Sequence, residues 1–159
     1  MPLGELVLAG AQARYLIPRS GSLEREPSIS EQSVQTIHSC LAAINAHDRD
    51  AFFAVLDPGI EWHMVGFFLD QEPDRKGYEE VWDYMTFLAE EFNEIHSEAE
   101  EVIEIDDRIV VPIRVTAKAA RTGATGELRF TSVFTVRDGQ IVEVRNYTGK
   151  EEALEAVRG

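Results

Sequence analysis

A carboxylate and an imidazole lie two residues apart in the stretch IEWHMVGFFLD, residues 60–70. Side chains alternate between the two faces of an extended strand, so Glu61 and His63 would share one face and Trp62 would occupy the other. Histidine changes charge near neutral pH, and a neighbouring carboxylate can orient its ring, as a general base requires. The pair could serve acid–base catalysis, or it could be a polar strand surface in contact with water.

The composition limits the classes of partner. The chain has 29 acidic and 15 basic residues and a net charge of −14, which repels nucleic-acid backbones and anionic membranes. Its single cysteine excludes an internal disulfide, and no group of cysteines and histidines has metal-ligand spacing. No apolar run approaches the roughly 20 residues that cross a bilayer. We expect a cytoplasmic protein with no metal, cofactor, nucleic-acid or membrane partner.

The elements that must position these side chains are predicted to begin after an N-terminal arm, residues 1–27, which is rich in proline, glycine and serine. Residues 28–159 then form one domain. A capping box at Ser28 and Glu31 starts a helix that runs to about residue 46. Asp48 caps a short helix over residues 49–56, which Pro58 and Gly59 end. A strand follows from residue 60, and apolar spacing predicts a third helix over residues 78–92.

A pattern of period two after the third helix predicts four antiparallel strands, over residues 99–105, 109–119, 127–136 and 141–148. The segment RDGQ between the last two is a hairpin signal, and Pro112 in the second strand indicates a sheet edge or a bulge. A short helix over residues 150–157 closes the chain. Three helices, a lone strand and a four-stranded meander predict an α+β fold whose curved sheet wraps around helices and leaves a cavity at its open end.

The order of elements and three stretches resemble the SnoaL-like branch of the nuclear transport factor 2-like superfamily. The stretches are LAAINAHDRDAFFAVLDPGIEWH, RKGYEEVWDYMTFL and FTVRDGQIVEVRNYTGKEEALEA, and the resemblance covers about residues 30–157. It implies a cystatin-like cone, a curved antiparallel sheet around three helices with a pocket at the open end. Relatives include ketosteroid isomerase, limonene epoxide hydrolase and polyketide cyclases, so the scaffold identifies fold better than function.

The resemblance implies that Glu61 and His63 face the pocket. The catalytic Asp of ketosteroid isomerases, in a motif E-D-P-V-G, falls on His63 when that motif is laid on E-W-H-M-V-G. The water-binding Asn of limonene epoxide hydrolases falls on the same residue, and a Tyr two positions earlier falls on Glu61. Two comparisons therefore place the same strand face toward the pocket.

Other family positions carry different residues in this chain. The isomerase oxyanion hole falls on Cys40 and Ser132, so steroid isomerase activity is not expected. The acid-rich end of the last strand in many SnoaL-like proteins falls on Asn146 and Gly149, so the usual cyclase base is missing. Cys40 also shares a helix face with apolar residues, which favours a small buried side chain over a nucleophile.

The sequence thus predicts a small-molecule-binding protein, with a cofactor-independent acid–base enzyme of isomerase, cyclase or hydrolase type as its active form. Its substrate would be small and apolar, and His63 and Glu61 would be catalytic. The residues expected to contact the ligand are Cys40, Trp62, Phe68, Trp82, Met85, Phe130, Ser132, Phe134, Arg145 and Tyr147. The alternative is a non-catalytic module for ligand binding or dimerisation, which Glu61 and His63 outside the cavity would favour.

A homodimer is also predicted. Family members often pair through the outer face of the sheet, and that face here would alternate apolar, hydroxyl and charged side chains. The residues on it are Val110, Arg114, Thr116, Thr131, Val133 and Thr135.

Overall fold

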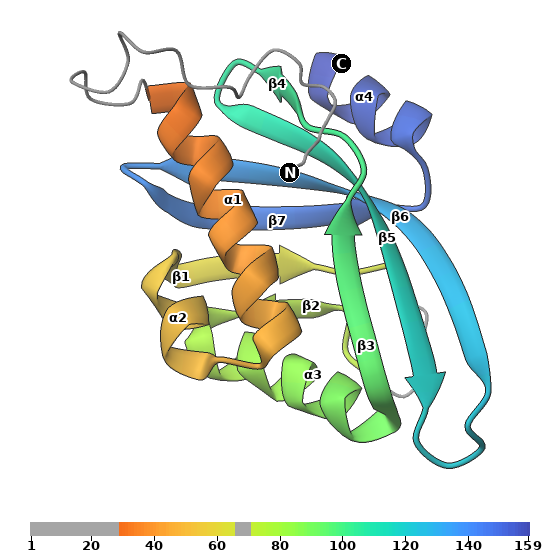
Figure 1. Cartoon of the computed structure of the whole chain (residues 1–159). Coiled ribbons are helices and arrows are strands. Elements are labelled where there is room, and N and C mark those ends of the chain that lie inside the picture. Colours follow the sequence, from red (N-terminus) through yellow and green to blue (C-terminus); the bar gives the residue numbers. More distant parts are fainter. Residues whose placement is uncertain (1–28, 66–70) are drawn as a thin grey trace, which may run out of the picture.

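The computed structural model describes residues 29–65 and 71–159 (Figure 1). The elements are α1 (Ile29–Ala46), α2 (Arg49–Ala54), β1 (Leu56–His63), β2 (Asp74–Lys76), α3 (Gly77–Glu91), β3 (Phe92–Ala99), β4 (Ile103–Ile105), β5 (Arg108–Ala119), β6 (Thr125–Arg137), β7 (Gln140–Tyr147) and α4 (Lys150–Arg158). The predicted arm, Ser28 of the predicted capping box and Phe68 lie outside the described residues.

The helices form where the apolar spacing and the capping residue predict them. Asp48 precedes α2, and its Oδ1 accepts a hydrogen bond from the backbone N–H of Ala51 at 3.1 Å. This contact satisfies one of the donors that a helix start leaves without a partner. In α3, Val81, Tyr84 and Met85 are buried on one face, as the spacing i, i+3, i+4 requires. No helix in the described ranges is long and apolar enough to cross a membrane.

The sheet is mixed and has the strand order β2-β1-β7-β6-β5-β3, with β4 also paired to β5. The predicted lone strand is therefore wrong: β1 pairs parallel to β7 and antiparallel to the short β2. It also begins at Leu56 rather than at residue 60. Pro58 and Gly59 lie where the β1–β7 register shifts between Leu56 and Glu61, the kind of irregularity that tolerates proline in a strand.

The first part of the meander differs from its prediction. Residues 92–99 form the strand β3, and the pairing with β5 is interrupted before β4 begins at Ile103. Pro112 lies opposite this interruption, in an interior strand and not at an edge. The backbone N–H of Glu100 donates to the carbonyl of Pro112 at 2.8 Å. The broken pairing accommodates a residue that has no backbone N–H to offer.

The hairpin between β6 and β7 is confirmed. Asp138 and Gly139 both have positive φ, 53° and 78°, the backbone conformation that a two-residue hairpin turn requires. An irregularity between Thr135 and Val136 then shifts the pairing of β6 and β7 by one residue. Phe134 pairs with Val144, and Ser132 pairs with Asn146.

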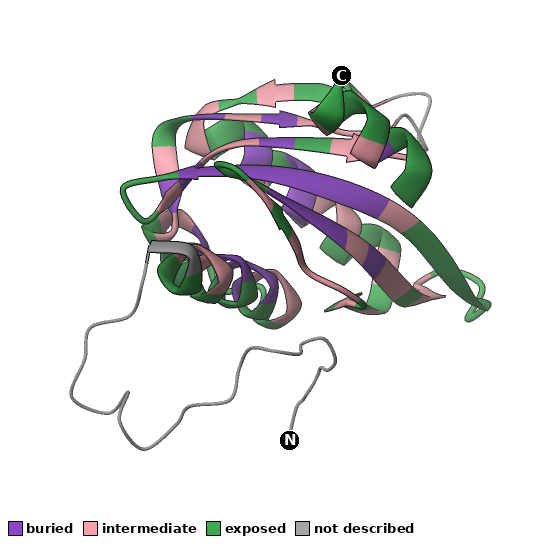
Figure 2. Ribbon diagram, turned by 90° about the horizontal axis from the view of Figure 1, so that it is seen from above, coloured by how far each residue is buried: buried purple, intermediate pink, exposed green. Residues whose placement is uncertain are grey.

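The two faces of the sheet pack against different helices. The concave face carries Ile60, Trp62, Phe134 and Val144, which belong to the main core together with residues of α1, α2 and α3. The helix α4 contacts β5, β6 and β7, and its Ala153 packs with two valines of the opposite face in a second, smaller core. Figure 2 shows the buried residues concentrated along the middle of the long strands.

Much of the outer face on which the predicted homodimer rested is covered. Val110 and Val133 lie in the small core beside α4, and Thr131 and Thr135 are buried as well. The expectation of an open face at these positions is wrong because the last helix folds back across the meander. The homodimer itself stays a prediction.

Candidate functional site

A cavity of about 1150 Å³ lies between the concave face of the sheet and the second halves of α1 and α3. Strands β1, β3, β5, β6 and β7 supply the rest of its wall. The wall as a whole is mostly apolar, with Leu41, Ile44, Leu88 and Val115 among its residues, and its charged or titratable members are His47, Glu94, His96, Lys118 and Glu127. Pockets that bind small molecules commonly measure about 300–1,000 Å³ and are lined mainly by hydrophobic side chains. The open end of the cone is thus hollow, as the fold predicts.

Five of the predicted ligand contacts line this cavity: Trp62, Met85, Phe130, Ser132 and Phe134. They come from β1, α3 and β6, which are far apart in the sequence. Each carries a side chain on the core-facing side of its element, because the cavity is a continuation of the core.

Four other predicted contacts do not line the cavity. Cys40 is fully buried in the main core, and burial raises the pKa of its thiol to about 12. Trp82 stacks on His47 with 4.5 Å between ring centroids. Arg145 and Tyr147 lie on the other face of β7, where Tyr147 packs with the core beside α4. The thiol keeps its proton at neutral pH, which agrees with its predicted role as a small apolar side chain.

Ser132 and Asn146 form the polar contact of the cavity wall. The hydroxyl of Ser132 donates to the side-chain oxygen of Asn146 at 2.5 Å, across the β6–β7 pair. The sequence indicated Ser132 but not Asn146 as a ligand contact. The sequence feature that could have indicated Asn146 is its position near the end of the last strand, where many SnoaL-like proteins have an acidic residue. The contact orients the amide of Asn146 and leaves its NH₂ donors unused within the described chain.

Two further polar side chains at the cavity have defined roles. The amide of Asn45 exchanges two hydrogen bonds with the backbone of Ser97, at 2.9 and 2.8 Å, so it joins α1 to β3. Burial raises the pKa of the Tyr84 phenol, and the positive charge of Arg75, 5.6 Å from its ring, lowers it less. The phenol therefore stays protonated at neutral pH and can donate a hydrogen bond.

Glu61 and His63 lie outside the cavity, so the predicted orientation is wrong. In the parallel pair of β1 and β7, Trp62 is opposite Val144 of the main core, whereas Glu61 is opposite Glu143 and His63 opposite Arg145. Trp62, Met64 and Val65 are the residues of β1 and of the segment after it that line the cavity. Neighbouring residues of a strand face opposite sides, so the positions carried over from the family motif, Glu61 and His63, are those that alternate with the cavity-facing ones.

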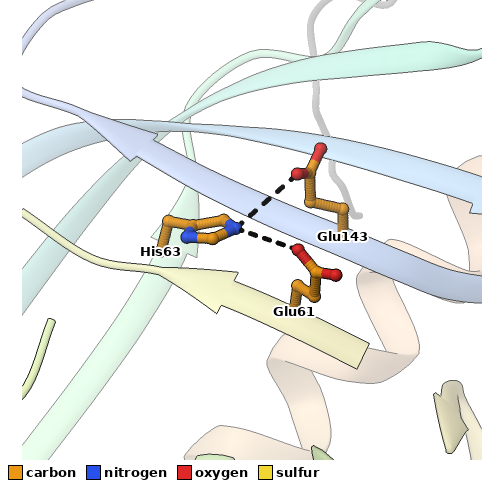
Figure 3. A group of neighbouring side chains, drawn as sticks. All are labelled: Glu61, His63 and Glu143. Carbon is orange, nitrogen blue, oxygen red and sulfur yellow. Dashed lines mark ion pairs between the residues drawn. The ribbon is translucent and has the colours of Figure 1, made fainter. Parts of the chain in front are cut away.

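The outward side chains of β1, β2 and β7 form a compact polar cluster, consisting of Glu61, His63, Asp74 and Glu143. His63 Nδ1 lies 2.9 Å from Asp74 Oδ1, while Nε2 lies 3.4 Å from Glu61 Oε1 and 3.6 Å from Glu143 Oε2 (Figure 3). The side chains of His63, Glu143 and Glu61 are 20, 37 and 45% exposed. The sequence missed Asp74 and Glu143 because only strand pairing brings them to His63.

Comparison with known proteins supports the fold and the family. A family model described as the SnoaL-like domain matches residues 37–144. No curated protein matches the sequence. TerC, in a crystal structure with polyporic acid, is 18% identical, with 80% of this chain and 99% of that chain covered and a TM-score of 0.67.

Two further solved structures are similar. An NTF2-like protein of unknown function from Burkholderia pseudomallei K96243 is 21% identical, with 80% of this chain and 98% of that chain covered and a TM-score of 0.67. A candidate SnoaL-like polyketide cyclase from Jannaschia sp. CCS1 is 22% identical, with 84% and 96% covered and a TM-score of 0.66. These likenesses establish the shared fold and confirm the predicted α+β cone.

Proposed function

The chain belongs to the SnoaL-like domain family, and we propose that it binds a small, largely apolar molecule in the cavity between its concave sheet and helices α1 and α3. The cavity itself is the observation that carries the proposal. Its apolar wall favours ligands that remove hydrophobic surface from water on entry. TerC, which has this fold, was co-crystallised with a small molecule, polyporic acid.

The polar contact in the wall defines the group that the ligand presents. Ser132 uses its hydrogen to hold the Asn146 carbonyl, so the free donors are the two N–H groups of the Asn146 amide. Tyr84 adds a protonated phenol to the same cavity. A ligand carbonyl or hydroxyl oxygen satisfies these donors, so the proposed ligand is an apolar, ring-containing molecule with at least one such oxygen.

The placement of the two predicted catalytic residues favours binding over proton transfer by that pair. An acid–base enzyme needs its base within reach of the substrate, and Glu61 and His63 lie on the other face of the sheet from the cavity. The amide and hydroxyl of Asn146 and Ser132 neither accept nor release a proton at neutral pH. The predicted pair therefore does not act in the cavity, and we place a non-catalytic binding module first. The titratable side chains that do line the cavity, His47, Glu94, His96 and Glu127, keep a cofactor-independent isomerase, cyclase or hydrolase as the second candidate.

Tryptophan fluorescence tests the proposal directly, because the chain has two tryptophans and only Trp62 lines the cavity. Polyporic acid and a panel of one- to three-ring ketones, quinones and phenols serve as probes. A bound ligand should change the emission of Trp62 saturably and raise the melting temperature. In Trp62→Phe most of the fluorescence response should be lost, because Trp82 does not line the cavity and touches it only through His47, on which it stacks.

Neighbouring residues of β7 provide matched variants for the polar contact. Asn146→Leu should weaken binding of a carbonyl probe by roughly tenfold, the equivalent of one hydrogen bond, and spare its carbonyl-free analogue. Arg145→Leu, one residue away on the other face, should leave both affinities unchanged. Equal losses in the two variants, or a probe response of undiminished size in Trp62→Phe, would place the ligand elsewhere. A probe turned over by the wild-type protein would instead establish the enzyme.

A further inference from the structure

We propose that Glu61, His63 and Glu143 bind a divalent transition-metal ion on the convex side of the β1–β7 pair, away from the cavity. In residues 29–65 and 71–159 they are the one group of at least three histidine, cysteine or acidic side chains whose ligand atoms lie within 4.8 Å of one another. The three side chains point toward a common position in Figure 3. Two ligands come from β1 and the third from β7.

The two distances from the imidazole nitrogen fit an ion, and all three ligand atoms lie within 4.8 Å of one another. A tetrahedral zinc ion with bonds of about 2.0–2.2 Å to nitrogen and oxygen holds neighbouring ligand atoms about 3.3–3.6 Å apart. His63 Nε2 lies 3.4 Å from Glu61 Oε1 and 3.6 Å from Glu143 Oε2. Both distances exceed a normal hydrogen bond yet match the edge of a coordination tetrahedron. The partial exposure of both glutamates leaves room for water as a further ligand.

The position of Asp74 prepares the imidazole for coordination. Its Oδ1 lies 2.9 Å from His63 Nδ1, so the neutral ring donates its N–H there and keeps a lone pair on Nε2. A carboxylate that holds the far nitrogen of a histidine in this way is the usual partner of a metal-binding histidine. Asp74 is therefore a positioning residue and not a ligand.

The Nε2 atom supplies an independent observation. It is buried and makes no hydrogen bond within the described chain, although it faces two carboxylates. A lone pair opposite two groups that also only accept is repulsive unless a cation lies between them. A proton on Nε2 would make only long contacts with the two glutamates, whereas a metal ion would satisfy all three acceptors at bonding distance.

The two nearby cationic side chains, Lys76 and Arg145, do not occupy the position between His63 Nε2 and the two glutamates. Lys76 Nζ is 3.9 Å from the other oxygen of Glu61, and a guanidinium nitrogen of Arg145 is 3.3 Å from Glu143 Oε2. Both cationic side chains are largely solvent-exposed, at 72 and 45%. They reduce the repulsion between the glutamates without providing a donor to His63 Nε2.

The ligand set also indicates the class of ion. Imidazole favours zinc, iron, nickel and copper, whereas sites built from oxygen alone favour magnesium and calcium. One nitrogen with two carboxylates therefore favours a first-row divalent ion such as Zn²⁺ over Mg²⁺ or Ca²⁺. Because β1 and β7 are joined only through tertiary structure, the ion would link the N-terminal half of the chain to the last strand of the meander.

Calorimetric titration of chelator-treated, full-length protein with Zn²⁺ alone tests the proposal. We expect one ion per chain and a higher melting temperature with Zn²⁺, since the ion binds the folded state. Mg²⁺ and Ca²⁺ at the same concentration should have no effect. Affinity should fall at acidic pH, where protons compete for the imidazole.

Variants identify the ligands. His63→Ala should weaken Zn²⁺ binding at least a hundredfold and Glu143→Gln at least tenfold, while Asp74→Ala should cost about 10–100-fold as the loss of an orienting partner. Circular dichroism checks that each variant folds, and Glu143→Gln preserves side-chain shape if His63→Ala is unstable. Glu104→Gln on β4 and His96→Ala on β3, at the far side of the sheet, should bind normally.

Two results would overturn the metal site. One is the absence of stoichiometric Zn²⁺ binding at neutral pH. The other is Zn²⁺ binding that survives both His63→Ala and Glu143→Gln, which would locate the ion elsewhere. Neither result depends on whether the cavity binds a ligand.

Discussion

The two faces of the β1–β7 pair are built from alternating residues of the same strands and have opposite character. On the concave face, Trp62 and Val144 lie opposite each other in the main core, and Trp62 also lines the cavity. On the convex face, Glu61 lies opposite Glu143, and both are partly exposed beside His63. One face can receive an apolar ligand, and the other has the chemistry to hold a cation.

This difference shows that the cavity lies against the apolar face of β1. Ile60 and Trp62 alternate with Glu61 and His63, and the larger apolar side chains take the face that packs on the helices. Turning β1 over would bury the carboxylate of Glu61 and the imidazole of His63 among hydrophobic residues, which costs several kcal/mol for an unpaired charge. The apolar residues Ile60 and Trp62 therefore indicate which face of β1 lies inside, and the chemically reactive types of Glu61 and His63 do not.

The largest effect that tests this comparison is expected at two adjacent positions of β1. Trp62→Ala removes a side chain that is 6% exposed and packs 5.9 Å from the ring of Phe52, so it should lower the free energy of unfolding by about 3–5 kcal/mol. Glu61→Ala in metal-free protein should change it by no more than about 0.5 kcal/mol, because the Glu61 side chain is 45% exposed and its contacts with His63 and Lys76 are long. Urea unfolding measures both. Similar losses would contradict the assignment of the two faces.

Cys40 probes how well the concave side excludes water. Burial raises the pKa of its thiol from 9.0 to about 12, which lowers the thiolate fraction near neutral pH about a thousandfold. Modification by a thiol-specific disulfide reagent in the folded protein should therefore be slower than in unfolded protein by at least that factor. Rapid modification under native conditions would show that the core beneath α1 opens readily.

A smaller effect is expected at the turn that joins β6 to β7, the strand that carries Asn146 and Arg145 on opposite faces. Gly139 has a φ of 78°, and its Cβ position is free of contacts, so Gly139→Ala should destabilise the fold by about 1–2 kcal/mol through backbone strain alone. Gly126→Ala in β6 is the matched control, because that position is equally open and has no positive φ.

Thermal or urea unfolding compares the two glycine variants. Gly126→Ala should leave stability unchanged to within about 0.5 kcal/mol. An equal loss in both variants would mean that the turn conformation does not control the hairpin.

Short sequence patterns predicted most of the helices and turns, because these elements depend on residues close together in the chain. The spacing of apolar residues gave α1 and α3, Asp48 gave the start of α2, and the RDGQ segment gave the β6–β7 turn. The errors occur where pairing partners are distant. The short β2 has no pattern of its own, and β1 depends on contacts with β7, some 80 residues later in the chain.

The sequence by itself determined the family, the order of most elements and the fact that Glu61 and His63 share a face opposite Trp62. These properties follow from backbone periodicity, which each segment carries with it. Only the tertiary structure decided which face is inside, and it did so by pairing β1 with β7 and packing the apolar side on the helices. The same pairing brought Glu143 to His63 and put Asn146 in the cavity wall, because strand register is a property of two segments together and of neither one alone.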